Sequence, residues 1–270
     1  MGSTFPLTDI RLYIRGIVMM LSNKKQVWVS PKYRGYIMWQ GPSSLTGADI
    51  VVIATMETSN RKTGGMVQVW ILDVNMNPVE AAKTGADDSI CGDCQHKPTN
   101  KKTCYVNIGQ APLAVWKGFH RGIYPVFDID KHGPMFVNRY TRLGAYGDPA
   151  AAPFEIMEML AKIGLGNTGY THQAARKDFD IRFIGICQVS ADTPKQAAKW
   201  QAKGAKTFRV ALEGDSLAEG EIECLADSEG IQCIDCGLCN GVQQNIAITV
   251  HGRGASKFKS AMVIPTVQVA

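Results

Sequence analysis

Seven of the eight cysteines in this 270-residue chain fall into two groups, and their spacing constrains the fold more than any other sequence feature. The N-terminal cysteine group consists of Cys91, Cys94 and Cys104, and the C-terminal cysteine group consists of Cys224, Cys233, Cys236 and Cys239. Outside an oxidising compartment, spaced cysteines in a chain of this size are better explained by metal binding than by disulfides. Each group therefore predicts a loop whose sulfur atoms converge on a metal centre.

The C-terminal cysteine group contains the run CIDCGLC at 233–239, in which a thiol recurs at every third residue. Gly237 permits the left-handed backbone that a tight turn between thiols needs. Four thiolates suit either Zn²⁺ or a cubane iron–sulfur cluster, and the CxxCxxC spacing is more typical of iron–sulfur ligation. We expect a 4Fe–4S cluster here, with Zn²⁺ as the alternative.

The N-terminal cysteine group offers three sulfurs and no fourth cysteine. Three thiolates would hold a 4Fe–4S cluster with one iron open to a substrate or cofactor. A structural zinc site would instead need a closing ligand such as His96 or Asp93. A site shared with the other group, or no metal, is the remaining alternative. The eighth cysteine, Cys187, lies in an apolar run and is expected to be a small buried residue.

Composition indicates a folded globular protein without a membrane span. Hydrophobic residues make up 45% and charged residues 20% of the chain, which provides material for a core and excludes a collagen or a coiled coil. The longest apolar run, Ile10–Leu21, is about half of the ~20 residues that a bilayer requires, and it contains Arg11 and Arg15. No secretory cleavage site follows that run, so a cytoplasmic location is expected.

The chain is predicted to contain one main domain between two short extensions. Residues 1–45 form an N-terminal extension, in which Met19 or Met20 is an alternative start. Residues 46–255 form the metal-binding domain, and residues 256–270 form a C-terminal tail. The 29 basic and 24 acidic residues give a net charge of +5, which favours a polyanionic partner without requiring one.

The order of apolar runs predicts an α/β fold. Two β-rich runs, Ala48–Met56 and Met66–Val74, flank a polar turn and predict an N-terminal β-hairpin. Farther along, strands and helices alternate at intervals of roughly 30 residues, which is typical of parallel βα units that form a full or partial barrel. Strands are predicted at 142–146, 169–172, 181–189, 207–212 and 245–250, and helices at 111–120, 153–163 and 194–204.

Polar residues follow several of these predicted strands. In α/β folds, chemistry gathers where the carboxyl ends of the strands meet. The residues expected at this rim are Gly147, Asp148, Tyr170, Thr171, His172, Ser190, Asp192 and His251. As catalytic residues we predict Asp148, His172 and His251, and as cofactor-binding residues Gly147, Asp148 and Ser190. Asp148 has an alternative explanation as the N-cap of the segment that follows it.

Six segments, spread over residues 45–255, resemble the gene-product-88-like family of phage and plasmid proteins. They are SNRKTG at 59–64, CGDC at 91–94 with CYVNIG at 104–109, RLGAYGDPA at 142–150, GYTH at 169–172, VSAD at 189–192, and CIDCGLC followed by ITVHG. The resemblance implies a phage-type protein located in the host cytoplasm. It implies no particular activity.

More distantly, the order of parts is similar to that of radical S-adenosylmethionine enzymes. Those enzymes have a strand, a three-cysteine loop, a helix, a strand that ends in a Gly–acid–Pro turn, further βα units and a C-terminal auxiliary cysteine site. The resemblance implies that the turn at Gly147, Asp148 and Pro149 holds the amino group of S-adenosylmethionine bound to an open iron. The usual loop spacing is CxxxCxxC, whereas here CxxC is followed by nine residues and Cys104.

Three functions follow as hypotheses. The first is an iron–sulfur enzyme with a reactive cluster in the N-terminal cysteine group, an auxiliary one in the C-terminal group, and S-adenosylmethionine as small-molecule cofactor. The second is a non-enzymatic zinc protein whose basic segments Lys101–Lys102, Lys131–Arg142 and Arg253–Lys259 contact nucleic acid. The third is a metal-dependent hydrolase that uses the three predicted catalytic residues, although no paired-carboxylate or HxH spacing supports it.

Overall fold

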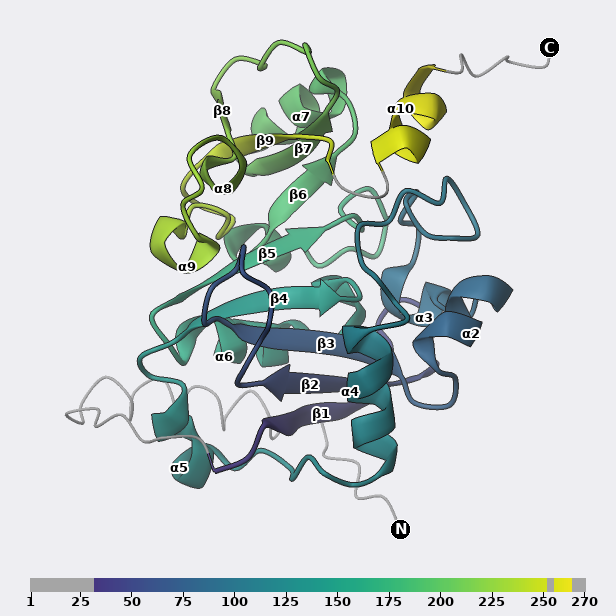
Figure 1. Ribbon diagram of the computed structural model, residues 1–270, viewed down its shortest axis with the longest axis vertical. Helices are drawn as coiled ribbons and strands as arrows, with labels where there is room; N and C mark the ends of the chain where they lie inside the picture. Colours follow the sequence, from purple (N-terminus) through teal and green to yellow (C-terminus); the bar gives the residue numbers. More distant parts are fainter. Residues whose placement is uncertain (1–31, 252–254, 264–270) are drawn as a thin grey trace.

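Figure 1 shows the computed structural model, in which residues 32–251 and 255–263 are described. Nine strands form one sheet in the order β1-β2-β3-β4-β5-β6-β7-β9-β8. The strands are β1 (Gly35–Pro42), β2 (Asp49–Thr55), β3 (Val67–Asp73), β4 (Tyr140–Tyr146), β5 (Gly166–Thr171), β6 (Gln188–Ala191), β7 (Thr207–Ala211), β8 (Glu221–Glu223) and β9 (Asn245–Thr249). The predicted start at Met19 or Met20 and the run Ile10–Leu21 lie outside the described residues.

The sheet combines an antiparallel hairpin region with a longer parallel region. β1, β2 and β3 pair antiparallel, and every pairing from β3–β4 onward is parallel. The α/β class and the hairpin are therefore as predicted. Within the described residues the sheet is open, with β1 and β8 at its edges, so it does not close into a full barrel.

Helices cover both faces of this sheet. α2 (Pro78–Thr84), α3 (Asp88–Cys91) and α4 (Ala111–His120) contact β3, while α6 (Phe154–Lys162) packs on β4 and β5, and α7 (Pro194–Gln201) on β6 and β7. Figure 1 shows α4 in front of the sheet, with α6 and α7 behind it. The other helical segments are α5 (Ile129–His132), η1 (Gly133–Met135), η2 (Pro149–Ala151), η3 (Ile181–Gly185), α8 (Leu225–Ser228), α9 (Cys233–Cys236) and α10 (Ala255–Val263).

The helix starts follow the signals in the sequence. Pro112 lies in the first turn of α4, where its missing N–H costs nothing. At α7 the Thr193 side chain accepts a hydrogen bond from the Gln196 N–H, and Pro194 is the first helical residue. No helix in the ranges that the structure describes has the length and apolarity needed to cross a bilayer.

The predicted strand at 181–189 is wrong over most of its length. Ile181–Gly185 form the 3₁₀ helix η3, and β6 begins only at Gln188. The Asp180 side chain accepts a hydrogen bond from the Arg182 N–H and so caps η3, which leaves Ile181 55% exposed. Cys187 is fully buried, as predicted, and an added Cβ on Gly169 would come within 2.8 Å of its sulfur.

Structured elements extend beyond the predicted domain limits. β1 lies within the proposed extension 1–45, yet it pairs with β2, and Tyr36 is fully buried against Phe127 and Phe136. α10 spans the whole described part of the tail, and its Phe258 is buried. The sheet and its packing therefore begin before residue 46 and include the helix after β9.

Candidate functional site

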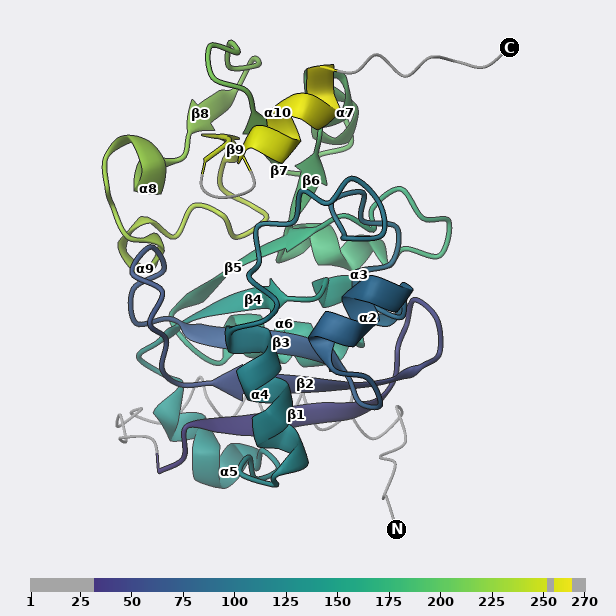
Figure 2. The ribbon, with the colours of Figure 1, turned by 45° about the vertical axis from the view of Figure 1, so that its right-hand side comes forward.

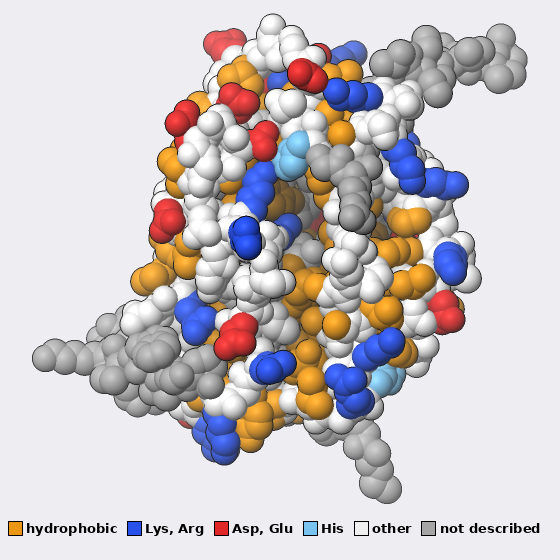
Figure 3. Space-filling view, viewed as in Figure 1, with side chains coloured by type: hydrophobic (Ala, Val, Ile, Leu, Met, Phe, Trp, Pro, Cys, Tyr) orange, Lys and Arg blue, Asp and Glu red, His pale blue; other side chains and the backbone are white. Residues whose placement is uncertain are grey.

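A cavity of about 340 Å³ lies over the parallel part of the sheet. Figure 3, which has the same orientation as Figure 1, shows the hollow near the centre of the face opposite α6 and α7. Side chains alternate between the two faces of a strand. Arg142, Gly144 and Tyr146 of β4 therefore line the cavity, while Thr141 and Leu143 are buried on the other face. β5, β6, β7 and β9 supply the rest of this floor with Thr168, Tyr170, Ser190, Phe208, Val210 and Ile248.

All six segments that carry the family resemblance contribute to the wall of this one cavity. One lining residue from each segment, in chain order, is Lys62, Cys91, Arg142, His172, Ser190 and Cys236. Parallel strands end at one edge of a sheet, which accounts for the convergence of the segments after β4, β5 and β6. Of the residues predicted at the rim, only Thr171 does not line the cavity. It is fully buried, and its hydroxyl donates to Asp148.

The N-terminal cysteine group occupies one end of the cavity. Cys91 is the last residue of α3, and the next residue, Gly92, has a φ of +48°, a left-handed conformation that costs a glycine little. Gln173 fastens this turn: its Nε2 donates to the Cys91 carbonyl at 2.9 Å, and its Oε1 accepts from the Asp93 N–H at 3.2 Å. The cysteine loop is thus attached to the end of β5.

The three thiols of this group lie close enough to influence one another. Burial raises the pKa of Cys91 well above its usual value, and the neighbouring Cys94 and Cys104 raise it further. Burial likewise raises the pKa of Cys94 to about 12, with Cys104 adding to the shift. Three thiolates in such surroundings need a nearby positive charge, which a metal centre would supply.

The two residues proposed to close a zinc site here have other partners. His96 hydrogen-bonds through Nδ1 to the Thr103 hydroxyl at 2.6 Å and through Nε2 to Asp192 Oδ1 at 2.8 Å. The Asp93 carboxylate is 72% exposed and lies 3.4 Å from Arg176. In this arrangement the N-terminal cysteine group presents three sulfurs to the cavity without a fourth protein ligand from either residue.

The surroundings of these sulfurs leave room and a hydrogen-bonding group for a bound cofactor. The Tyr146 hydroxyl is buried and has no hydrogen-bond partner among the described residues. Gly144 has a φ of +68°, and an added Cβ would come within 2.7 Å of the Gly147 carbonyl oxygen. The close contact at Gly144 is therefore with the protein's own turn, whereas the unpartnered buried hydroxyl of Tyr146 fits a group held against β4.

Asp148 connects the cysteine loop to the sheet. Its N–H donates to the Ile90 carbonyl at 2.7 Å, and it is 6% exposed. Its carboxylate oxygens accept from four donors, which are Ala150 N, Thr171 Oγ1, His172 N and Gln173 Nε2. Burial raises the pKa of Asp148, and these hydrogen bonds oppose that shift. Asp148 is therefore the N-cap of η2, which was the alternative explanation from the sequence. Its other hydrogen bonds position the segment after β5.

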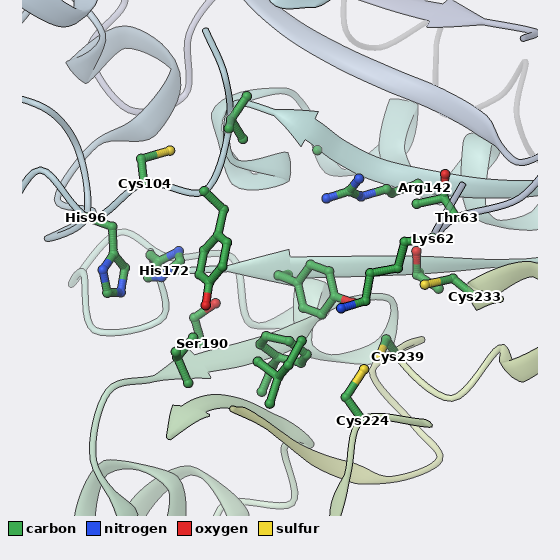
Figure 4. A pocket seen from close by; sticks show the side chains of 18 of the residues that line it. Lys62, Thr63, His96, Cys104, Arg142, His172, Ser190, Cys224, Cys233 and Cys239 are labelled. Atoms are coloured by element: carbon green, nitrogen blue, oxygen red, sulfur yellow. The ribbon is translucent and has the colours of Figure 1, made fainter. Parts of the chain in front are cut away.

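The other predicted cofactor-binding residues, Gly147 and Ser190, also line the cavity. Gly147 has a φ of +82°, and an added Cβ would come within 2.8 Å of the Ile71 carbonyl oxygen. A side chain is therefore excluded from the turn between β4 and η2. Ser190, on β6, lies on the same side of the sheet as His172 (Figure 4).

The C-terminal cysteine group occupies the opposite end of the cavity, as Figure 4 shows. Cys224 precedes α8, Cys233 and Cys236 are the ends of α9, and Gly237 closes α9 with a φ of +64°, as the spacing predicted. The pKa of Cys239 is raised to about 12, chiefly by burial; the other three thiols also raise it, and the Tyr170 hydroxyl lowers it. The other three sulfurs therefore lie close enough to Cys239 to affect its ionisation.

The β2–β3 loop crosses the sheet to support this end (Figures 1 and 2). The Cys233 N–H donates to the Lys62 carbonyl at 2.9 Å, and Gln232 Nε2 donates to the Arg61 carbonyl at 2.6 Å. Lys62 Nζ lies 3.2 Å from His251 Nε2, and His251 Nδ1 lies 2.8 Å from the Thr249 carbonyl. A carbonyl oxygen can only accept a hydrogen bond, so His251 Nδ1 donates to it. His251 Nε2 then accepts a hydrogen bond from the Lys62 ammonium group.

A further cluster, called here the His–Asp site, consists of His96, His172 and Asp192. One ligand atom from each lies within 4.8 Å of the others. Burial, with a smaller contribution from the nearby His96, lowers the pKa of His172 to about 4, so the His172 ring is neutral near pH 7. The sequence alone did not group these three residues as one site. His172 and Asp192 were predicted at one rim because they directly follow β5 and β6. No feature of the sequence predicted that His96 lies beside them.

The sequence placed Tyr170 at the rim but did not identify Lys62, Arg142 or Tyr105 as residues of the site. Arg142 and Lys62 extend into it between the two cysteine groups in Figure 4, and Tyr105 lines it. The alternation of Arg142, Gly144 and Tyr146 with buried residues in β4 is the signal that could have identified this face. Three residues of the basic segments proposed to contact nucleic acid can be compared with this arrangement. Arg142 points into the cavity, Lys131 forms an ion pair with Asp128 at 2.8 Å, and Arg253 lies outside the described residues.

The chain matches no protein-family model, no curated protein and no solved structure. A fold alone does not define an activity, so function has to be inferred from the chemistry of the cavity.

Proposed function

We propose that the protein is an iron–sulfur enzyme of the radical S-adenosylmethionine type. The N-terminal cysteine group would ligate a 4Fe–4S cluster with one open iron, and the C-terminal cysteine group would ligate a closed auxiliary cluster. We also propose that β3 to β7 and β9 form a partial barrel around the cavity, with α6 and α7 outside it. Membership of the gene-product-88-like family is part of the same proposal.

The observation that carries this proposal is that two cysteine groups, more than 100 residues apart in sequence, line opposite ends of one cavity. A structural zinc site has no need of a shared cavity. A volume of about 340 Å³ lies within the range of about 300–1,000 Å³ that small-molecule sites occupy. The absence of a fourth ligand from His96 or Asp93 favours an open position at the N-terminal end.

The turn after β4 supports the proposed cofactor. Gly147 and Asp148 follow the strand next to β3, and Asp148 is bonded through its N–H to the loop that carries Cys91. A molecule bound at the N-terminal cysteine group would therefore contact this turn. A reduced cluster of this kind would supply one electron to the sulfonium of S-adenosylmethionine and cleave its C5′–S bond. The products would be methionine and a 5′-deoxyadenosyl radical, which would become 5′-deoxyadenosine by taking a hydrogen atom from a molecule held in the cavity. His172 and Ser190 line the wall beside it, and His251 lies at the far end with the auxiliary group.

The proposal is tested first by metal analysis of protein purified without oxygen. Iron with equimolar sulfide and a brown colour are expected, whereas a colourless protein with stoichiometric zinc would contradict the proposal. The reconstituted protein, reduced with dithionite in the presence of S-adenosylmethionine, should then release 5′-deoxyadenosine. A fully loaded protein that releases none would exclude the radical mechanism.

The zinc and nucleic-acid hypothesis makes a separate prediction. Contacts with phosphates would give binding that weakens steeply with salt, because each contact releases counterions. We expect such binding to be weak or absent at ~150 mM salt, since Arg142 is committed to the cavity. Tight binding that is lost when Arg253 and Lys257 are replaced would favour that hypothesis.

A further inference from the structure

We propose that His96, His172 and Asp192 bind one divalent transition-metal ion, such as Zn²⁺ or Fe²⁺, in the wall of the cavity. This His–Asp site is separate from both cysteine groups and does not depend on what they bind. Two imidazoles and one carboxylate are a common ligand set for a single catalytic metal ion, and three protein ligands leave positions for water or a substrate.

The ligand atoms have the spacing that one ion requires. His96 Nε2 and Asp192 Oδ1 are 2.8 Å apart, and all three ligand atoms lie within 4.8 Å of one another. Ligands at about 2.0–2.1 Å from a metal are about 2.9–3.4 Å from their neighbours in octahedral or tetrahedral geometry. Small side-chain movements would therefore bring all three onto one ion.

The residues around His96 fix its ring in the orientation of a metal ligand. Its Nδ1 is bonded to the hydroxyl of Thr103, which is 2% exposed, and its ring stacks on Phe258 of α10 at 5.8 Å. Metal-bound histidines usually have the second ring nitrogen held by such a hydrogen bond, so that the first points at the metal. Here Nε2 is the nitrogen that faces the other two ligands.

His172 supplies the second, independent observation. Its N–H donates to Asp148 Oδ2 at 2.7 Å, which fixes its backbone, and its ring meets the His96 ring edge-on at 5.3 Å. Among the described residues, no hydrogen bond joins either of its ring nitrogens. A partly buried imidazole beside a carboxylate and a second imidazole, without a protein partner of its own, fits a ligand of a metal ion.

The position of the site indicates what the metal ion would contact. His96, His172 and Asp192 all line the cavity, at the end occupied by the N-terminal cysteine group. Phe258 covers the His96 ring, so the open metal positions face the cavity. The ion would therefore bind an oxygen or nitrogen donor of a small molecule held there, and polarise that group as a Lewis acid.

The test is a titration with Co²⁺ of the full-length protein, purified with its cysteine sites already filled. We expect one further equivalent to bind with the visible d–d bands of nitrogen and oxygen ligands and without a thiolate charge-transfer band. His172→Ala and Asp192→Asn should each abolish this binding. Thr103→Val should weaken it by about 10–100-fold, the usual effect of removing a supporting hydrogen bond. His120→Ala, a histidine outside the cavity, is the matched control and should bind normally.

The content of tightly bound iron or zinc and the melting temperature of each variant are measured in parallel. Unchanged values for His172→Ala show that the loss of Co²⁺ binding is local. The proposal is overturned if His172→Ala still binds one equivalent with wild-type affinity, or if the bound Co²⁺ shows thiolate charge transfer. Bound Co²⁺ is counted by metal analysis after dialysis, and its bands are taken as the difference from the spectrum recorded before Co²⁺ is added, because an iron–sulfur cluster absorbs in the same region. The outcome is then independent of whether the filled cysteine sites hold iron–sulfur clusters or zinc.

Discussion

The two ends of the cavity are built in different ways. The N-terminal cysteine group begins at the last residue of α3, whose Ser89 and Ile90 are buried. Hydrogen bonds join this region to Gln173 and Asp148, which lie just after β5 and β4. In the C-terminal cysteine group, Cys224 precedes α8, and Cys233 and Cys236 are the ends of α9. Neither of these two short helices has a buried residue, and within the group only Cys239, which follows α9, is buried. More of the first end is therefore packed into the protein core, and we expect the second end to depend more on what its sulfurs bind. The contrast fits the proposal of a functional centre at the first end and a structural centre at the second.

The largest effect should follow from removing a ligand at the structural end. Cys236→Ala should leave little soluble protein, because metal binding by preorganised thiolates contributes on the order of 10 kcal/mol to folding. Solubility, metal content and thermal unfolding are the measurements. Cys187→Ala is the control, since Cys187 is buried but belongs to neither group. A soluble Cys236→Ala protein with unchanged metal content and unchanged melting would contradict the assignment.

A smaller effect is expected at the buried ion pair between Arg209 and Glu221, which joins β7 to β8 beside the C-terminal end. The two side chains are 2% and 0% exposed and lie 2.6 Å apart. Glu221→Gln leaves a buried guanidinium unpaired, so we expect a loss of about 3–5 kcal/mol in the free energy of unfolding at pH 7. Denaturant unfolding of the variant and the wild type measures this difference.

The same pair predicts the direction of the pH dependence. Burial alone would raise the pKa of Glu221, but hydrogen bonds from Arg209 and the Ala218 N–H hold that pKa below its usual value. A carboxyl with a lowered folded-state pKa stabilises the protein above the unfolded value of about 4.3, and this stability is lost as pH falls through the folded-state pKa. The difference between wild type and Glu221→Gln should therefore shrink in acid. A difference that stays constant down to the lowest pH measured would show that the carboxylate charge is not its cause.

Asp148→Asn should have a moderate effect, confined to the functional end. The amide nitrogen cannot accept the hydrogen bonds that one carboxylate oxygen receives, so we expect a loss of about 1–3 kcal/mol in the free energy of unfolding. Because Gln173 bonds both Asp148 and the Cys91 carbonyl, metal content at the N-terminal cysteine group should fall as well. Equal metal loss at both ends would mean that the two ends are not independent.

The smallest effect on stability is expected for Cys104→Ser. This variant should lose about half of the iron and all formation of 5′-deoxyadenosine, while its melting temperature stays close to that of the wild type. Metal analysis and thermal unfolding measure the two quantities. Collapse of the fold, comparable to that expected for Cys236→Ala, would remove the contrast between the two ends.

Much of the fold could be predicted because its signals are local. The apolar run at 207–212 matches β7, and Thr193 with Pro194 marks the start of α7. The prediction of a strand at 181–189 was wrong because an apolar run alone does not distinguish a strand from a 3₁₀ helix, which here is capped by Asp180. β1 was missed because its apolar residues were attributed to an extension, although Tyr36 packs in the main core.

The candidate site was predictable only where spacing is short. The cysteines within CGDC and CIDCGLC are neighbours in the chain, so their convergence follows from the sequence. His96 and Asp192 are 96 residues apart, and they meet because the loop after Cys94 reaches the end of β6. Arg142 faces the cavity because it alternates along β4 with residues of the other face, which α6 covers. The contact between His96 and Asp192 has no local sequence signal, and the alternation in β4 does not by itself show which face borders the cavity.

The most direct test of an open iron at the N-terminal cysteine group is electron paramagnetic resonance of the dithionite-reduced protein with and without S-adenosylmethionine. The difference between the spectra of the wild type and Cys104→Ser isolates the signal of this group. We predict that S-adenosylmethionine shifts this signal in the wild type and leaves the remaining spectrum of Cys104→Ser unchanged. Identical wild-type spectra with and without S-adenosylmethionine would contradict the account.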